Sequence, residues 1–138
     1  MDEKDLDKLT RETAARLLGD HAPKEDRPYT LWREFDPELA KEFSRFVVGR
    51  LYSRSVLTQR ERELCAVGAL VVSRCWDELY IHCHAALNVG ATREEVAEVI
   101  FQMATYAGVP SMVEGLRALK KALQARGEWE PRGGKTDA

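Results

Sequence analysis

The sequence has 138 residues, with 23 acidic and 21 basic side chains, so its formal net charge is −2. Hydrophobic residues make up 44% and charged residues 32%, which fits one globular domain and excludes a disordered or fibrous chain. The near-neutral charge argues against nucleic acid as a partner. No segment has the roughly 20 apolar residues that span a bilayer, and the charged N-terminus is unlike a signal peptide. We therefore expect a soluble, cytoplasmic protein with no membrane partner.

Helical patterns run through almost the whole chain. Leucines at spacings of three and four predict a first helix over residues 5–18, followed by a proline-containing loop over 21–30. Asp36-Pro37 is typical of a capped first turn and opens a helix over 37–51. The apolar residues of that helix fall on one stripe, which comprises Leu39, Phe43, Phe46, Val47 and Leu51.

Two capping boxes mark later helix starts, one at Thr58 with Glu61 and one at Thr92 with Glu95. They and the glycines between them predict helices over 58–73, 75–89, 92–107 and 110–127. No run of alternating β-branched residues predicts a strand. The fold prediction is all-α, a single domain of about six helices over residues 1–127, with a disordered polar tail over 128–138.

Four polar side chains are expected on core-facing arcs of two successive helices. Successive helical residues turn by about 100°, which places Cys75, Glu78 and His82 on one arc and His84 on the opposite, solvated side. The same arithmetic puts Glu63 in the middle of the apolar stripe of the preceding helix.

A buried carboxylate is costly unless it has a partner, and these side chains could be partners for one another. Such clusters shift proton affinities and are often sites of chemistry. The structural alternative is an ion pair of Glu63 with Arg60 or Arg74, and ordinary surface pairing of Glu78 with His82. The two remaining cysteines, Cys65 and Cys83, are expected to fill the core.

Several segments together resemble the carboxymuconolactone decarboxylase family, over about residues 10–123. The segments that carry the resemblance are Arg16-Leu17-Leu18-Gly19-Asp20, Leu57-Thr58-x-Arg60-x-Arg62-Glu63-Leu64, Glu78-x-x-x-His82, Ala85-Ala86-Leu87-Asn88-x-Gly90-Ala91-Thr92-Arg93-Glu94-Glu95-Val96 and Tyr106-Ala107-Gly108-Val109-Pro110. The resemblance implies an alkylhydroperoxidase D-like helical fold, an enzyme without a cofactor, and a homo-oligomer, either a trimer or a hexamer. The uncharged stretch Val99–Val113 is consistent with packing between copies.

The family has two branches with different chemistry. One decarboxylates a lactone that bears carboxylates. The other, the alkylhydroperoxidase D type, reduces peroxides with a Cys-x-x-Cys-x-x-x-His helix and a glutamate on the preceding helix. Here the motif is Cys75-x-x-Glu78-x-x-x-His82, with Glu63 matching the preceding glutamate. Because Glu78 replaces the second cysteine, a dithiol mechanism within the motif is excluded, and Cys83 lies about 12 Å along the helix from Cys75, too far for a disulfide.

The leading hypothesis is a lyase that performs acid–base chemistry on a small carboxylated lactone or related organic acid. His82 would move the proton, Glu78 or Glu63 would support it, and Arg54, Arg60 or Arg62 could bind the anionic substrate. The second hypothesis is a thiol-dependent peroxidase that uses Cys75 with Glu63 and His82. The third is a non-catalytic helical assembly protein. No metal is expected, because ligands at positions i, i+3 and i+7 of one helix converge poorly.

Overall fold

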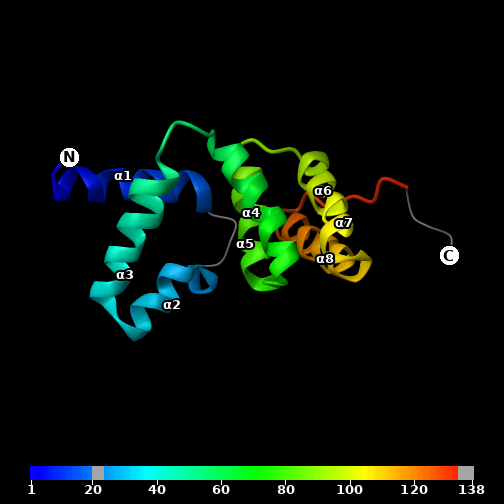
Figure 1. The fold of residues 1–138 in the computed structure, drawn as a ribbon, viewed down its shortest axis with the longest axis horizontal. Coiled ribbons are helices and arrows are strands. Elements are labelled where there is room, and N and C mark those ends of the chain that lie inside the picture. Colours follow the sequence, from blue (N-terminus) through cyan, green and yellow to red (C-terminus); the bar gives the residue numbers. More distant parts are fainter. Residues whose placement is uncertain (20–23, 134–138) are drawn as a thin grey trace.

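The computed structural model describes residues 1–19 and 24–133 of the chain (Figure 1). These residues form helices and connecting segments and contain no strand, which confirms the all-α prediction. In chain order the elements are α1 (Glu3–Leu18), the 3₁₀ turn η1 (Lys24–Asp26), α2 (Pro28–Phe35), α3 (Pro37–Ser44), the π-helix η2 (Arg45–Tyr52), α4 (Gln59–Ser73), α5 (Trp76–Asn88), α6 (Arg93–Gln102), α7 (Ala104–Ala107) and α8 (Val109–Ala125).

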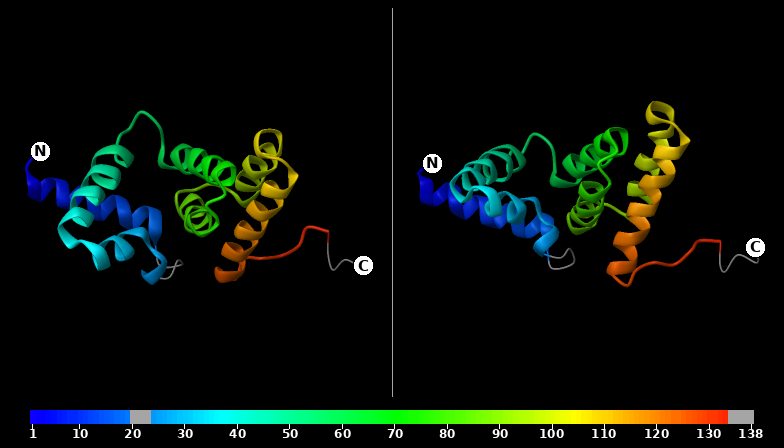
Figure 2. Two further views of the ribbon diagram at one scale, coloured as in Figure 1. Left: turned by 60° about the horizontal axis from the view of Figure 1, so that its bottom comes forward. Right: turned by 90° about the horizontal axis from the view of Figure 1, so that it is seen from below.

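Helix α5 lies at the centre of the molecule and packs against α1, α4 and α8. Figures 1 and 2 show α1 to α3 at one end, α4 and α5 in the middle, and α6 to α8 at the other end. The core is formed mainly by α4, α5, α6 and α8, and includes Val67, Val71, Leu79, Val96, Ile100 and Leu123. Among the described residues, no helix has both the length and the apolar character needed to cross a membrane.

Sequence signals at the helix ends determine where α4 and α6 begin, and α4 is joined to α5 in a tight hairpin. Both predicted capping boxes are confirmed: Thr58 and Thr92 each accept a hydrogen bond from the backbone N–H of the glutamate three residues later. Helix α4 ends at Arg74, whose φ of 57° lies in the left-handed region, and Cys75 is already the N-cap of α5. This short connection places the first half of α4 beside the second half of α5.

The structure differs from the prediction in the region before α4. Part of the expected loop belongs to α2, which begins with Pro28 in its first turn; residues 20–23 of that loop lie outside the described residues. The single helix expected over 37–51 is divided into α3 and the π-helix η2, which extends to Tyr52. The predicted apolar stripe is not a core face, since four of its members are exposed, namely Leu39, Phe43, Phe46 and Leu51.

Two further boundaries differ at the C-terminal end. The helix expected over 92–107 is interrupted at Met103 and becomes α6 and α7. After α8, Trp129 packs against the core, with the guanidinium of Arg93 4.8 Å and the ammonium of Lys120 5.1 Å from its ring centroid. The first residues of the expected tail therefore contact α6 and α8, and residues 134–138 lie outside the described residues.

Candidate active site

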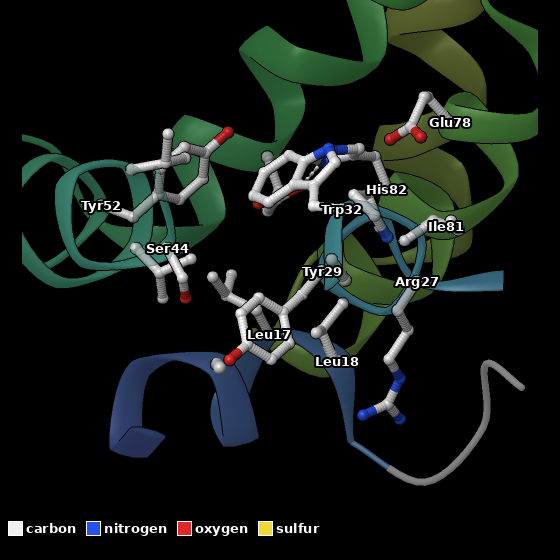
Figure 3. Close-up of a pocket in the computed structure, with 16 residues that line it drawn as sticks. Leu17, Leu18, Arg27, Tyr29, Trp32, Ser44, Tyr52, Glu78, Ile81 and His82 are labelled. Carbon is white, nitrogen blue, oxygen red and sulfur yellow. Dashed lines mark hydrogen bonds and ion pairs between the residues drawn. The ribbon is translucent and has the colours of Figure 1, made fainter. Parts of the chain in front are cut away.

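A cavity of about 360 Å³ lies between the N-terminal helices and the α4–α5 hairpin. This volume is within the range that small-molecule sites occupy. Its walls are mostly apolar, and Figure 3 shows Trp32, Tyr52 and His82 bordering the same hollow. The lining residues come from α1 (Ala14, Leu17, Leu18), from α2 and the residue before it (Arg27, Pro28, Tyr29, Trp32), from α3 and η2 (Ser44, Val47, Val48, Tyr52), from α4 (Glu63) and from α5 (Glu78, Ile81, His82, Ala85).

Glu63 and His82 meet in the wall of this cavity. The Oε2 atom of Glu63 lies 2.6 Å from Nδ1 of His82, so the carboxylate accepts a hydrogen bond from that ring nitrogen. The Glu63 side chain is 1% exposed, as its place in the apolar stripe predicted, and the His82 side chain is 25% exposed. Because Nδ1 is occupied by Glu63, Nε2 is the ring nitrogen that remains for a ligand.

The surroundings of His82 favour its protonated form. Burial alone would lower the pKa of the imidazole, but the hydrogen bond to Glu63 and the charges of Glu63 and Glu78 outweigh it. The pKa of His82 is therefore raised above its ordinary value of 6.5. The pair therefore favours a proton on a ring nitrogen beside an apolar cavity, which is what a general acid needs.

The four predicted site residues are not all brought together. Glu78, one turn before His82, is half-buried and lines the same cavity. Cys75 is exposed and does not line it; its sulfur lies 3.4 Å from the hydroxyl oxygen of Ser73, which donates to it. The thiol is thus placed at the N-terminus of α5, on the surface rather than in the cluster.

The alternative arginine partners of Glu63 are not used. Arg60 forms an ion pair with Glu95 on α6, and Glu63 is bound by His82 instead. Arg62 donates to the backbone oxygen of Arg54. None of these arginines lines the cavity, so those considered for binding an anionic substrate are not placed to do so.

Two predictions about single residues are wrong. His84 is fully buried rather than solvated, with its ring 4.8 Å from that of Tyr80, because α5 is covered by neighbours on both of its sides. Cys65 is exposed rather than a core residue. The prediction for Cys83 is confirmed: the side chain is fully buried, and burial raises the pKa of its thiol to about 12.

Five cavity residues with polar or aromatic side chains were missed by the sequence analysis: Arg27, Tyr29, Trp32, Ser44 and Tyr52. The first three are in or just before α2, in a stretch that its prolines made look like a loop. Tyr52 lies one residue beyond the predicted end of the 37–51 helix. The aromatic residues in and beside the predicted loop could have indicated these positions, because large rings usually pack against other side chains or a ligand.

Within residues 1–19 and 24–133, no three His, Cys, Asp or Glu side chains converge as metal ligands would. The expectations of no metal and no cofactor stay predictions.

Comparison with known proteins supports the family resemblance that the sequence motifs indicated. The model of the carboxymuconolactone decarboxylase family matches residues 37–121, which is more than half of the chain. The chain belongs to this family.

Two curated relatives of this family member have decarboxylase names. It is 31% identical over 75 residues to nitrosuccinic acid decarboxylase of Metarhizium robertsii, a match that covers 54% of this chain and 52% of the relative. It is 33% identical over 78 residues to 4-carboxymuconolactone decarboxylase of Acinetobacter baylyi, covering 56% of this chain and 58% of the relative. The matched region thus spans little more than half the length of these relatives.

Proposed function

We propose that this protein is a decarboxylase-like lyase that releases CO₂ from a small carboxylated organic acid, a lactone among the candidates, in the cavity beside His82. The observation that carries the proposal is the hydrogen bond between Glu63 and His82 in a cavity wall. The decarboxylase names of the two relatives support the same reaction class.

In the proposed reaction the C–C bond to the substrate carboxylate breaks and CO₂ leaves. The electron pair stays on the substrate, and the proton on Nε2 of His82 is transferred to the carbon that carried the carboxylate. Glu63 holds the ring through Nδ1 and stabilises its charged form, and Glu78 adds a second negative charge nearby. His82 therefore acts as the acid, and the two carboxylates favour its protonated form.

Release of CO₂ from nitrosuccinate and from 4-carboxymuconolactone tests this function directly. We expect wild type to accelerate the decarboxylation of at least one of these acids, and His82→Gln to abolish that acceleration because the amide cannot supply the proton. Glu98→Gln on α6 is the matched control, since Glu98 is exposed and lies outside the cavity. No acceleration of either acid, or an unchanged rate in His82→Gln, would contradict the proposal.

A substitution at Cys75 distinguishes the thiol-dependent hypothesis from the decarboxylase proposal. It requires Cys75, which lies outside the cavity, so Cys75→Ser should leave decarboxylation unchanged. Peroxide consumption in the presence of a thiol reductant, lost in Cys75→Ser, would instead support the peroxidase.

We also propose that the protein assembles as a homo-oligomer, a trimer or a hexamer. Large apolar side chains are exposed on α2 and η2, where they include Phe35 and Phe46, and on α7 and α8, where they include Tyr106 and Val109. Figure 1 shows α2 and α7 toward opposite ends of the molecule. Soluble monomers rarely leave large groups of such side chains in water. Light scattering should give three or six times the monomer mass, and a monomer would refute this.

A further inference from the structure

Tyr52 is a cavity residue that the chemistry described above does not use. It is the last residue of the π-helix η2, is half-buried, and lies in the wall of the hollow that also contains His82 (Figure 3). Its backbone oxygen accepts a hydrogen bond from the Gln59 side chain, but its hydroxyl makes no hydrogen bond within the described residues. Because Tyr52 lines the cavity, this hydroxyl can donate a hydrogen bond to a ligand that enters it.

The π-helical backbone places Tyr52 near the same face of η2 as Val47. In an α-helix, residues five apart point about 140° away from each other. In a π-helix they are joined by an i→i+5 hydrogen bond and follow one another on the same face. Both Val47 and Tyr52 line the cavity. Short π segments occur frequently at functional sites, and here the segment ends at the unused hydroxyl.

The electrostatic surroundings keep the Tyr52 hydroxyl protonated. Burial and the nearby negative charge of Glu63 raise its pKa to about 12. At neutral pH the group is therefore a hydrogen-bond donor and carries no charge of its own. Tyr52, Glu63 and His82 all line this one cavity, so a small ligand in it can contact the hydroxyl and the ring together.

Decarboxylation needs a donor of this kind. When CO₂ leaves, the electron pair is delocalised onto an oxygen of a neighbouring carbonyl, lactone or nitro group, and that oxygen gains negative charge. A neutral donor aimed at the oxygen stabilises the transition state more than the ground state, because the charge exists only after the bond has begun to break. His82 protonates the carbon, so a second group is needed at the oxygen.

We propose that the hydroxyl of Tyr52 binds the substrate oxygen that becomes negatively charged as CO₂ leaves, opposite the proton donor His82. The inference rests on the proposed function and narrows its substrate class. The substrate is an acid in which the carbon bearing the lost carboxylate is conjugated to a carbonyl, lactone or nitro oxygen. The atoms balance: one C–C bond breaks, CO₂ leaves, and the electron pair returns from that oxygen to form the new C–H bond with the proton from His82.

The kinetic test compares Tyr52→Phe with wild type on whichever of the two acids is turned over. Loss of one such donor typically lowers kcat by roughly 100- to 1,000-fold, and we expect KM to change little because the ground-state oxygen is only weakly bound. Tyr106→Phe is the matched control, because Tyr106 is exposed and outside the cavity. The thermal midpoint of Tyr52→Phe should match that of wild type, since its hydroxyl has no hydrogen-bond partner to lose within the described residues.

A binding test distinguishes failure of this inference from failure of the proposed function. The probes are 3-nitropropanoate, the product expected from nitrosuccinate, and its freshly neutralised nitronate, which carries the negative charge on oxygen. Wild type should bind the nitronate at least tenfold more tightly than the nitro form in calorimetry, and Tyr52→Phe should lose that preference while still binding the nitro form. Turnover that depends on His82 but not on Tyr52, or equal affinities for the two probes in wild type, would overturn the assignment of Tyr52. An intact, Tyr52-dependent nitronate preference without turnover would support the assignment of Tyr52 while removing the proposed reaction.

Discussion

Replacing Glu63 by Gln isolates the contribution of one buried charge. The amide keeps the size of the side chain and can still accept a hydrogen bond from Nδ1 of His82, but the charge that favours the imidazolium is lost. The Glu63 side chain is 1% exposed and its bond to His82 is 2.6 Å long, so little solvent screens the pair. A hydrogen bond to a charged group contributes about 1.5–3 kcal/mol, which sets the scale of the expected loss.

This loss of stability can be measured as a decrease in Tm. At about 2.1 cal/mol/K per residue, a chain of 138 residues has an unfolding entropy of roughly 0.3 kcal/mol/K, so Tm should fall by about 5–10 °C near pH 6. The pKa of His82 is raised by folding, so its stabilising effect is fully present below the unfolded pKa, near 6.5, and disappears as the pH rises through the folded pKa.

Calorimetry of Glu63→Gln at pH 6 and pH 9 should therefore give a Tm difference from wild type that shrinks on going to the higher pH. Glu98→Gln, exposed on α6, should show no difference at either pH. An NMR titration should place the His82 pKa lower in Glu63→Gln than in wild type. A Tm difference that is the same at both pH values, together with an unchanged His82 titration, would refute the electrostatic account of this pair.

Three other perturbations follow from the packing. In Gly49→Ala the new methyl group would overlap the hydroxyl of Thr10 on α1, which should lower the free energy of unfolding, measured by chemical denaturation, by about 1–3 kcal/mol. Adding Thr10→Ala in the same chain should restore much of this stability, and additive losses in the double variant would exclude the overlap. Thr92→Ala removes a capping box and should lower stability by about 0.5–2 kcal/mol in the same assay, with no loss if the cap is irrelevant. With Ellman's reagent, Cys75 should react in the native protein and Cys83 only after unfolding, because Cys83 is fully buried and its pKa is raised to about 12. Rapid reaction of Cys83 in the native protein would contradict its burial.

Much of the site was predictable because it depends on local patterns. Helical periodicity was enough to turn Glu63 toward the interior, and the two capping boxes fixed where α4 and α6 begin. The burial of His84 was not predictable, because periodicity identifies one apolar face whereas α5 is packed on both sides. The π-helix ending at Tyr52 has no local sequence code comparable to a cap, and it packs against α1, which is distant in sequence.

One part of the cavity lining lies within the segment that matches the family model, and the other part precedes that segment. The family match begins at residue 37, so it includes Glu63 and His82 but not Leu17 or Trp32, which line the same cavity. Substitutions within the first 36 residues can therefore reshape the cavity without replacing Glu63 or His82. A library of substitutions confined to α1 and α2 would therefore vary the shape of the cavity, while Glu63 and His82 stay constant.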